Sequence, residues 1–273
     1  MKKVLIAFDG KNFSEGAFEF ARKLNELQPI LLTGVFLPAS VFSSMWTYTD
    51  AITGIYAPMI EEEDTQKLEQ NIEKFEKHCR NNDIDFRVHK GFSDYALPNL
   101  EKESIFADLL IFGSEAFFEN LGSQSPNSYL QDALHSINCA AVIVPEKFDF
   151  PESIVLAYDG SNDSVFAIKQ FAYLFPELCD KEVLLVYATE DDEADFPYKI
   201  EMEELAARHF SNLTLCKLNI NPRKFFTAWI SEKKSALLVS GSYKRSGVSQ
   251  LFKKSFIKDV IAQHELPIFV THH

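Results

Sequence analysis

Apolar residues in the first half of this chain form short runs separated by longer stretches of helical periodicity. The short runs are rich in β-branched residues and do not alternate with polar ones, which is typical of strands buried on both faces by helices. They predict strands near 3–8, 30–36, 84–89, 107–112 and 140–144, with helices near 13–27, 61–82, 94–104 and 128–137. Strands that alternate with helices predict a parallel, doubly wound α/β sheet with right-handed crossovers.

The second half repeats this order of elements. The pattern predicts strands near 153–158, 182–188, 213–219, 236–240 and 267–271, with helices near 163–175, 198–210, 222–233 and 255–264. Short segments also repeat: residues 4–10, VLIAFDG, return at 154–160 as IVLAYDG. Two copies of one unit are therefore predicted, a first domain over 1–146 and a second over 151–273.

An insertion after the second strand distinguishes the two halves. It lies mainly in 37–60 and is aromatic, with Asp50 as its one charged residue before Glu61. A loop this long in a compact domain is usually a lid or a contact surface. An apolar arm packed on the protein itself is the alternative, and both interpretations stay open.

The charge of the chain is acidic and unevenly distributed. The formal net charge is −13, of which residues 1–150 carry −10 and residues 151–273 carry −3. An acidic surface argues against nucleic acid as a partner, because binding to the phosphate backbone depends on positive charge. The second half is the better place for an anion site, since the last third of the chain holds Arg223, Lys224, Lys233, Lys234, Lys244, Arg245, Lys253, Lys254 and Lys258.

Cysteine usage and apolar run lengths bear on the compartment. The four cysteines are scattered without a C-x-x-C pair, which indicates packed, reduced thiols and no metal site. Met1-Lys2-Lys3 leads directly into a strand-like run rather than a signal peptide, and no apolar run approaches the length of a membrane span. We expect a cytoplasmic protein without a membrane partner.

Two stretches of the second half carry a resemblance to a known family. A strand ends in Asp-Gly-Ser within residues 157–164, and a later strand ends in Gly-Ser within residues 239–247. Together with the repeated strand and helix order, they resemble the universal stress protein family, and the chain resembles a tandem, two-domain member. The resemblance implies an adenine-nucleotide alpha-hydrolase-like fold, two five-stranded sheets in order 3-2-1-4-5 packed as a pseudo-twofold pair. It also implies that the two fifth strands meet.

Nucleotide binders of that family carry Gly, two residues, Gly, nine residues, then Gly followed by Ser or Thr. By this resemblance Gly241 and Ser242 open the loop, Lys244 stands at the second glycine, and Lys254-Ser255 replaces the final Gly-Ser; Gly247 lies between. Glycine lets a backbone approach phosphate closely, so these side chains obstruct it while their charge attracts it. The alternative is a solvated basic surface without a ligand.

The same resemblance places an adenine base near the ends of the first two strands. In the second half it implies contacts from Asp159, Gly160 and Ala188. The first half has a degenerate counterpart, whose phosphate loop contains Glu115 and Glu119 and whose implied residues are Asp9, Gly10, Val35, Gly113 and Ser128. Each aspartate could instead close the turn that follows it. We prefer that role for Asp9, and for Asp159 both roles stay open.

No motif in the sequence indicates catalysis. The P-loop, the nucleophile elbow and the zinc-protease motif are all missing. Slow ATP hydrolysis is the most that the resemblance allows. Two hypotheses remain: a stress-response regulatory protein that binds ATP or AMP in the second domain, with Mg²⁺ if the ligand is ATP, or a tandem stress protein without nucleotide that acts as an interaction module. The sequence leaves the protein partner unnamed and a homodimer of tandem chains open.

Overall fold

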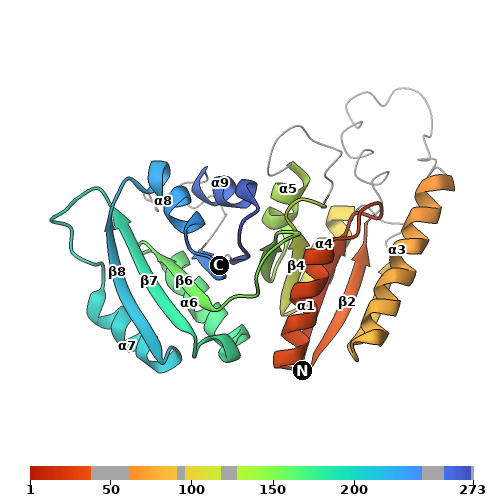
Figure 1. The fold of residues 1–273 in the computed structure, drawn as a ribbon, viewed down its shortest axis with the longest axis horizontal. Helices are drawn as coiled ribbons and strands as arrows, with labels where there is room; N and C mark the ends of the chain where they lie inside the picture. Colours follow the sequence, from red (N-terminus) through yellow and green to blue (C-terminus); the bar gives the residue numbers. More distant parts are fainter. Residues whose placement is uncertain (38–61, 91–95, 118–127, 242–254, 272–273) are drawn as a thin grey trace. The chain divides into compact units, whose positions relative to one another are not determined.

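The structure is a computed structural model that describes residues 1–37, 62–90, 96–117, 128–241 and 255–271 (Figure 1). The insertion expected over 37–60 therefore lies almost entirely outside the described residues. The chain divides into two compact units, unit 1 over Met1–Cys139 and unit 2 over Ala140–His273. Each unit has its own sheet region and helices.

Unit 1 contains four parallel strands in the order β3-β2-β1-β4. The first strand lies in the middle, where Val4 pairs with Leu32 of one neighbour and Leu109 of the other. The elements of unit 1 are β1 (Lys2–Phe8), α1 (Glu15–Leu27), β2 (Ile30–Phe36), α3 (Glu62–Asn81), β3 (Asp85–Lys90), α4 (Ala96–Ile105), β4 (Leu109–Gly113) and α5 (Ser128–Ser136).

Unit 2 repeats this topology in the order β8-β7-β6-β9-β10 and adds β5 beside β10. Its strands are parallel except for β5, which pairs antiparallel with β10 so that Val142 faces Phe269. The elements are β5 (Ala140–Val144), β6 (Ser153–Tyr158), α6 (Asn162–Leu174), the 3-10 helix η3 (Pro176–Leu178), β7 (Glu182–Thr189), α7 (Lys199–His209), β8 (Asn212–Asn219), α8 (Pro222–Ser231), β9 (Ala236–Gly241), α9 (Ser255–Gln263) and β10 (Ile268–Thr271).

The predicted fold class is confirmed, including the order 3-2-1-4-5, which is β3-β2-β1-β4-β5 in the first half and β8-β7-β6-β9-β10 in the second. Every strand and helix expected from the sequence is present, with ends that shift by at most two residues. The short η3 was missed, because three residues are too few to show a period. The two fifth strands meet as predicted, as β5 and β10. The packing of the halves as a pseudo-twofold pair and the domain limits 1–146 and 151–273 stay predictions.

Serine caps set where the first helix of each unit begins. The Ser14 hydroxyl accepts a hydrogen bond from the Ala17 amide at 3.1 Å, and the Ser161 hydroxyl accepts one from the Ser164 amide at 3.2 Å. Each bond satisfies an amide that has no partner within the first helical turn. The turn after the first strand is consequently shorter in unit 2, where α6 begins three positions earlier in the repeat than α1.

Helices cover each sheet in pairs. On one face of unit 1, Phe18 of α1 contacts Phe75 of α3 edge to face at 6.2 Å between ring centroids, while α4 and α5 pack together. Figure 1 shows α3, in orange, running beside β2. In unit 2, Tyr173 of α6 meets His209 of α7. The α8–α9 pair is joined by a bond of 2.6 Å between Ser231 and Gln263. Two covered faces explain why the central strands are mostly apolar.

One polar side chain is buried in the middle of β2. Thr33 is fully buried, and its hydroxyl has no hydrogen-bond partner among the described residues. Thr189 in β7 is also buried, but its hydroxyl accepts a hydrogen bond from the Asp191 amide at 3.1 Å. Burial of an unpaired hydroxyl costs free energy that a paired one largely recovers.

We predict that Thr33→Val will raise the free energy of unfolding by about 1 kcal/mol, because it removes an unpaired hydroxyl with little change of shape. The matched Thr189→Val should lower it, since the Asp191 amide loses its acceptor. Urea unfolding followed by circular dichroism measures both changes. Equal effects of the two substitutions would contradict the assignment of Thr33 as unpaired.

Candidate functional site

The candidate site lies at the carboxyl ends of the strands, where the order reverses between the first and fourth strand of each unit. Ligands of doubly wound sheets bind in the crevice at this point. In unit 2 the reversal is between β6 and β9, which end at Tyr158 and Gly241. The structure places Asp159, Gly160 and Gly241 around it.

Not all the residues predicted for the second-half site can be placed. Ala188 is buried near the end of β7, and Ser255 is the first residue of α9. Four residues of the loop between β9 and α9 lie outside the described residues: Ser242, Lys244, Gly247 and Lys254. Their role in holding phosphate stays a prediction.

The Asp159 carboxylate is only partly used by its own turn. Its Oδ1 accepts a hydrogen bond from the Ser161 amide at 2.9 Å. No residue that the structure describes donates to its Oδ2. Gly160, next along the turn, has φ of +78°, a conformation that favours glycine. Asp159 therefore stabilises the turn and still presents one acceptor oxygen.

Gly241 is required by packing as well as by any ligand. A Cβ atom at this position would lie 2.5 Å from the carbonyl carbon and oxygen of Asp163 and 2.6 Å from the Ser164 amide nitrogen. These are backbone atoms at the start of α6, which cannot move aside at low cost. The glycine that the motif reserves for phosphate is thus also the point where β9 touches α6.

Aromatic side chains cover one side of the Asp159 turn. The Phe196 ring, from the segment between β7 and α7, stacks on Tyr158 at 5.2 Å between centroids with 15° between the planes. It also contacts Tyr187 edge to face at 5.6 Å. The ring of Pro197 lies against Gly160, because a Cβ on that glycine would be 2.7 Å from the Cβ of Pro197.

A partly buried hydrogen bond holds the same segment against Tyr158. The Tyr158 hydroxyl donates to the Pro197 carbonyl at 2.9 Å. Burial, and secondarily the nearby Asp159 charge, raises the pKa of Tyr158 to about 12. The phenol therefore remains a neutral donor throughout the physiological pH range.

The first-half counterpart is closed by its own hydrogen bonds. Asp9 is only 3% exposed, and its Oδ1 accepts bonds from the amides of Lys11 at 2.9 Å and Asn12 at 2.7 Å. The Asn12 side-chain amide donates to Asp9 Oδ2 at 2.8 Å and to the Ala116 carbonyl at 3.2 Å. Asn12 therefore ties the turn after β1 to the segment after β4, across the point where a ligand would enter.

The corresponding asparagine of unit 2 plays no such part. Asn162 is the first residue of α6 and is exposed. It makes none of the equivalent hydrogen bonds among the described residues. The turn-closing role that the sequence suggested for Asp9 agrees with its bonds, and the two turns differ although both read Asp-Gly.

The remaining first-half residues lie at or near the ends of β1, β2 and β4 and at the start of α5. Gly10 has φ of +84°, and its carbonyl accepts a bond of 3.1 Å from the Asn71 side chain of α3. Val35 is buried and pairs with Ala7, so its counterpart in unit 2 is Val186, which pairs with Ala157. Gly113 ends β4 and Ser128 begins α5. Glu119 lies outside the described residues.

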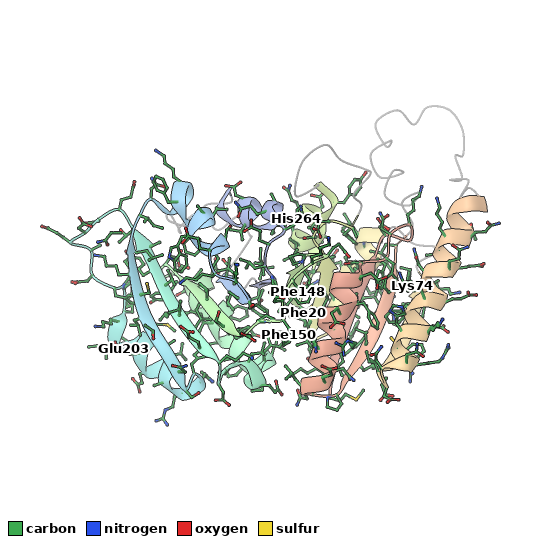
Figure 2. The ribbon with its side chains drawn as sticks, in the orientation of Figure 1. Phe20, Lys74, Phe148, Phe150, Glu203 and His264 are labelled. Carbon is green, nitrogen blue, oxygen red and sulfur yellow. The ribbon has the colours of Figure 1, made fainter. Side chains whose placement is uncertain are left out.

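An aromatic stack and a cation–π contact cover the first-half turn on the side of α3. Phe13 stacks on Phe8 at 4.8 Å between centroids, and the Lys74 ammonium lies 4.4 Å from the Phe13 ring centroid. Lys74 also pairs with Glu15. Figure 2 shows Lys74 on α3. The position over the last residue of the first strand is thus filled in both units, by Phe13 in one and by Phe196 in the other.

Two parts of this arrangement were missed in the sequence. Asn12 stands three residues after Asp9, which is a recognisable turn spacing, but its second bond to Ala116 spans 104 residues. Phe196 is 38 residues from Tyr158 and follows an acidic run that reads as a solvated loop. Only the folded chain brings these groups together.

Two further findings concern metal binding and membrane-spanning helices. In the described ranges, no group of three or more His, Cys, Asp and Glu side chains could hold a metal ion. A helix long and apolar enough to cross the bilayer was likewise not found in the described part of the chain.

Comparison with known proteins identifies the fold. No family model matches the sequence, and no curated protein matches it. Among solved structures, a universal stress protein from Archaeoglobus fulgidus DSM 4304 superimposes with a TM-score of 0.70 at 17% identity, covering 100% of this chain and 96% of that one. A functionally unknown protein from Pseudomonas aeruginosa PAO1 gives a TM-score of 0.57 at 12% identity, covering 100% of this chain and 92% of that one.

At these identities the likeness shows the fold. The chain has the fold of a universal stress protein over its whole length, which confirms the resemblance that the repeated segments predicted. The match to the A. fulgidus protein covers both halves of the chain, as expected for a tandem form.

We predict that Gly241→Ala will lower the free energy of unfolding by about 2–3 kcal/mol, because the methyl group meets the α6 backbone. Ser240→Ala, one residue earlier and only 3% exposed, should have a much smaller effect. Thermal unfolding without any ligand measures both. If Gly241→Ala unfolds at the same temperature as the parent protein, this glycine is not needed for packing.

Proposed function

We propose that this chain is a stress-response regulatory protein of the universal stress protein type, working in the cytoplasm, and that its second half binds an adenine nucleotide. The observation that carries the proposal is the difference between the two aspartates. Asp9 is occupied by three hydrogen bonds, whereas Asp159 keeps one carboxylate oxygen without a donor among the described residues.

The chemistry of the second crevice suits adenine at one end and phosphate at the other. A carboxylate oxygen can accept a hydrogen bond from the exocyclic amine of adenine or from a ribose hydroxyl. The start of α9 at Ser255 follows a loop that contains Lys244 and Lys254, and helix N-termini attract anions. ATP and AMP are the candidate ligands, with Mg²⁺ accompanying ATP, and slow hydrolysis is the most we expect of the site.

A second function is favoured by other contacts of the same crevice. Gly241 is explained by packing alone, and Pro197 covers Gly160. Nearby Tyr198 and Ile200 are 69% and 77% exposed, which is unusual for large apolar side chains. A tandem stress protein that binds no nucleotide and contacts a protein partner is therefore the alternative. Nucleotide titration of the parent protein, with analysis of any ligand released on denaturation, separates the two functions.

We predict that Asp159→Ala will weaken binding of ATP on the order of tenfold to a hundredfold, since a hydrogen bond to a charged acceptor is lost. Asp9→Ala should leave affinity unchanged but lower the free energy of unfolding by about 2 kcal/mol, because the turn loses all its acceptors. Calorimetric titration and urea unfolding of both variants measure the contrast.

Each variant is the control for the other, because both replace the aspartate of the same Asp-Gly turn. Loss of affinity in Asp9→Ala alone, or equal loss in both, would refute the assignment of the ligand to the second half.

We predict that replacing Lys244 and Lys254 together with alanine will weaken nucleotide binding at low ionic strength. The difference from the parent should shrink at high salt, because screening weakens charge-assisted contacts. The measurement is titration at two salt concentrations.

The double glycine variant at the same positions tests the alternative function. If the lysines only obstruct an abandoned site, glycine should restore backbone approach and create binding that the parent protein does not have. No binding by the parent, the double alanine and the double glycine variants would exclude the nucleotide function and leave the interaction module.

A further inference from the structure

Phe196, Pro197 and Tyr198 form a docked segment that we call the clasp. Three separate contacts hold it: the Phe196 ring on Tyr158, the Pro197 ring on Gly160, and the hydrogen bond of 2.9 Å from the Tyr158 hydroxyl to the Pro197 carbonyl. All three are made to the last residue of β6 or to the Asp159 turn. The clasp therefore lies against the residues that would receive the ligand.

The clasp is held in place against a local cost. Tyr198 has φ of 45° and ψ of 45°, the left-handed region that a tyrosine rarely adopts. It occupies the N-cap position of α7 without a side-chain hydrogen bond, so the first amides of that helix lack a cap. Release of the clasp would relieve the backbone strain, which brings the docked and released states closer in free energy.

The beginning of the segment is anchored separately from the clasp. The Lys217 ammonium of β8 donates to the Asp192 carbonyl at 2.6 Å, and the Asn221 side chain donates to Glu190 at 2.8 Å. The clasp can therefore leave Tyr158 while residues 190–192 keep their place. The Asp191 side chain and carbonyl also accept bonds from the Glu193 amide at 3.0 Å and the Ala194 amide at 3.3 Å, so the part left to move is short, from 195 to the start of α7.

The segment that leads into the clasp is strongly acidic. The residues that precede it are acidic and exposed: Glu190, Asp191, Asp192, Glu193 and Asp195. Carboxylates close to a bound polyanion raise its free energy.

The first half shows what a permanent filling of this position looks like. There the ring over the first strand is Phe13, which belongs to the turn between β1 and α1 and is further held by Lys74. In the second half the ring comes from a different segment, joined to the strand end by side-chain contacts and one hydrogen bond. Only the second arrangement can open without rebuilding the Asp-Gly turn.

We propose that the clasp controls access to Asp159, so that an adenine nucleotide binds the second half only when Phe196 and Pro197 leave Tyr158 and Gly160. This inference rests on the proposed nucleotide function and adds its regulation. Because only the released state is competent, the observed affinity is the intrinsic affinity reduced by the released fraction. The contacts between Tyr158 and Phe196 set the released fraction, and with it the nucleotide concentration at which the second half is occupied.

The test compares Phe196→Ala and Tyr158→Phe with the parent protein. Phe196→Ala removes the stacked ring, whereas Tyr158→Phe keeps the ring and removes only the hydroxyl that bonds Pro197. Phe225→Ala is the control, since Phe225 is 55% exposed on α8 and contributes nothing to the clasp. The readouts are amide hydrogen exchange over residues 193–200, which needs no nucleotide, and calorimetric titration with ATP and AMP.

We expect faster exchange over 193–200 in both clasp variants and affinity about two- to tenfold tighter in Phe196→Ala, the range that one aromatic pair provides. Adding ATP to the parent should speed exchange over the same residues, because the ligand displaces the clasp. Phe225→Ala should match the parent in both measurements.

The possible failures are distinguishable. If the parent binds ATP, and the variants release the clasp but bind no more tightly, the clasp does not control access and the nucleotide function stands. Slower exchange over 193–200 on adding ATP would also overturn the clasp, because the segment would then close on the ligand. If neither the parent nor any variant binds, the nucleotide function and this inference fail together.

Discussion

Parallel strands that are covered by helices on both faces leave the edge where the strands end as the place for polar chemistry. The first strands of the two units are apolar over residues 4–8 and 154–158, and Asp9 and Asp159 are the first charged groups beyond them. The backbone must turn there, begin a helix and fill the space above the sheet. Each requirement competes with a ligand for the same few residues, and Gly241 shows the competition most directly.

The two halves satisfy these requirements differently although their turns share the Asp-Gly sequence. Unit 1 uses a longer turn whose Asn12 reaches Ala116, and its own Phe13 covers Phe8. Unit 2 uses a shorter turn that starts α6 at once, and so it needs Phe196 from another segment. The first repeat thus covers this edge from within its own turn, and the second covers it from a separate segment.

The fold could be predicted because its signal is local. A buried strand such as β6 is a run of apolar residues, and the helix after it has a period that the sequence displays. The site could be predicted only in part. Asp159 and Gly241 stand at recognisable positions, but the contact of Gly241 with the α6 backbone and of Phe196 with Tyr158 join residues distant along the chain. Their effect depends on ångström-scale distances that no local pattern encodes.

The antiparallel pairing of β5 with β10 determines which fragments of the chain would have complete sheets. Residues 140–144, all apolar and buried, are the last strand of the first repeat in sequence but pair with the last strand of the second. A fragment that ends after the first repeat would carry this strand with its β10 partner missing, and an unpaired apolar edge invites association with other chains. A fragment that starts at the second repeat would expose β10 instead. The repeats are separable as sequence, but their sheets are complete only when both are translated as one polypeptide.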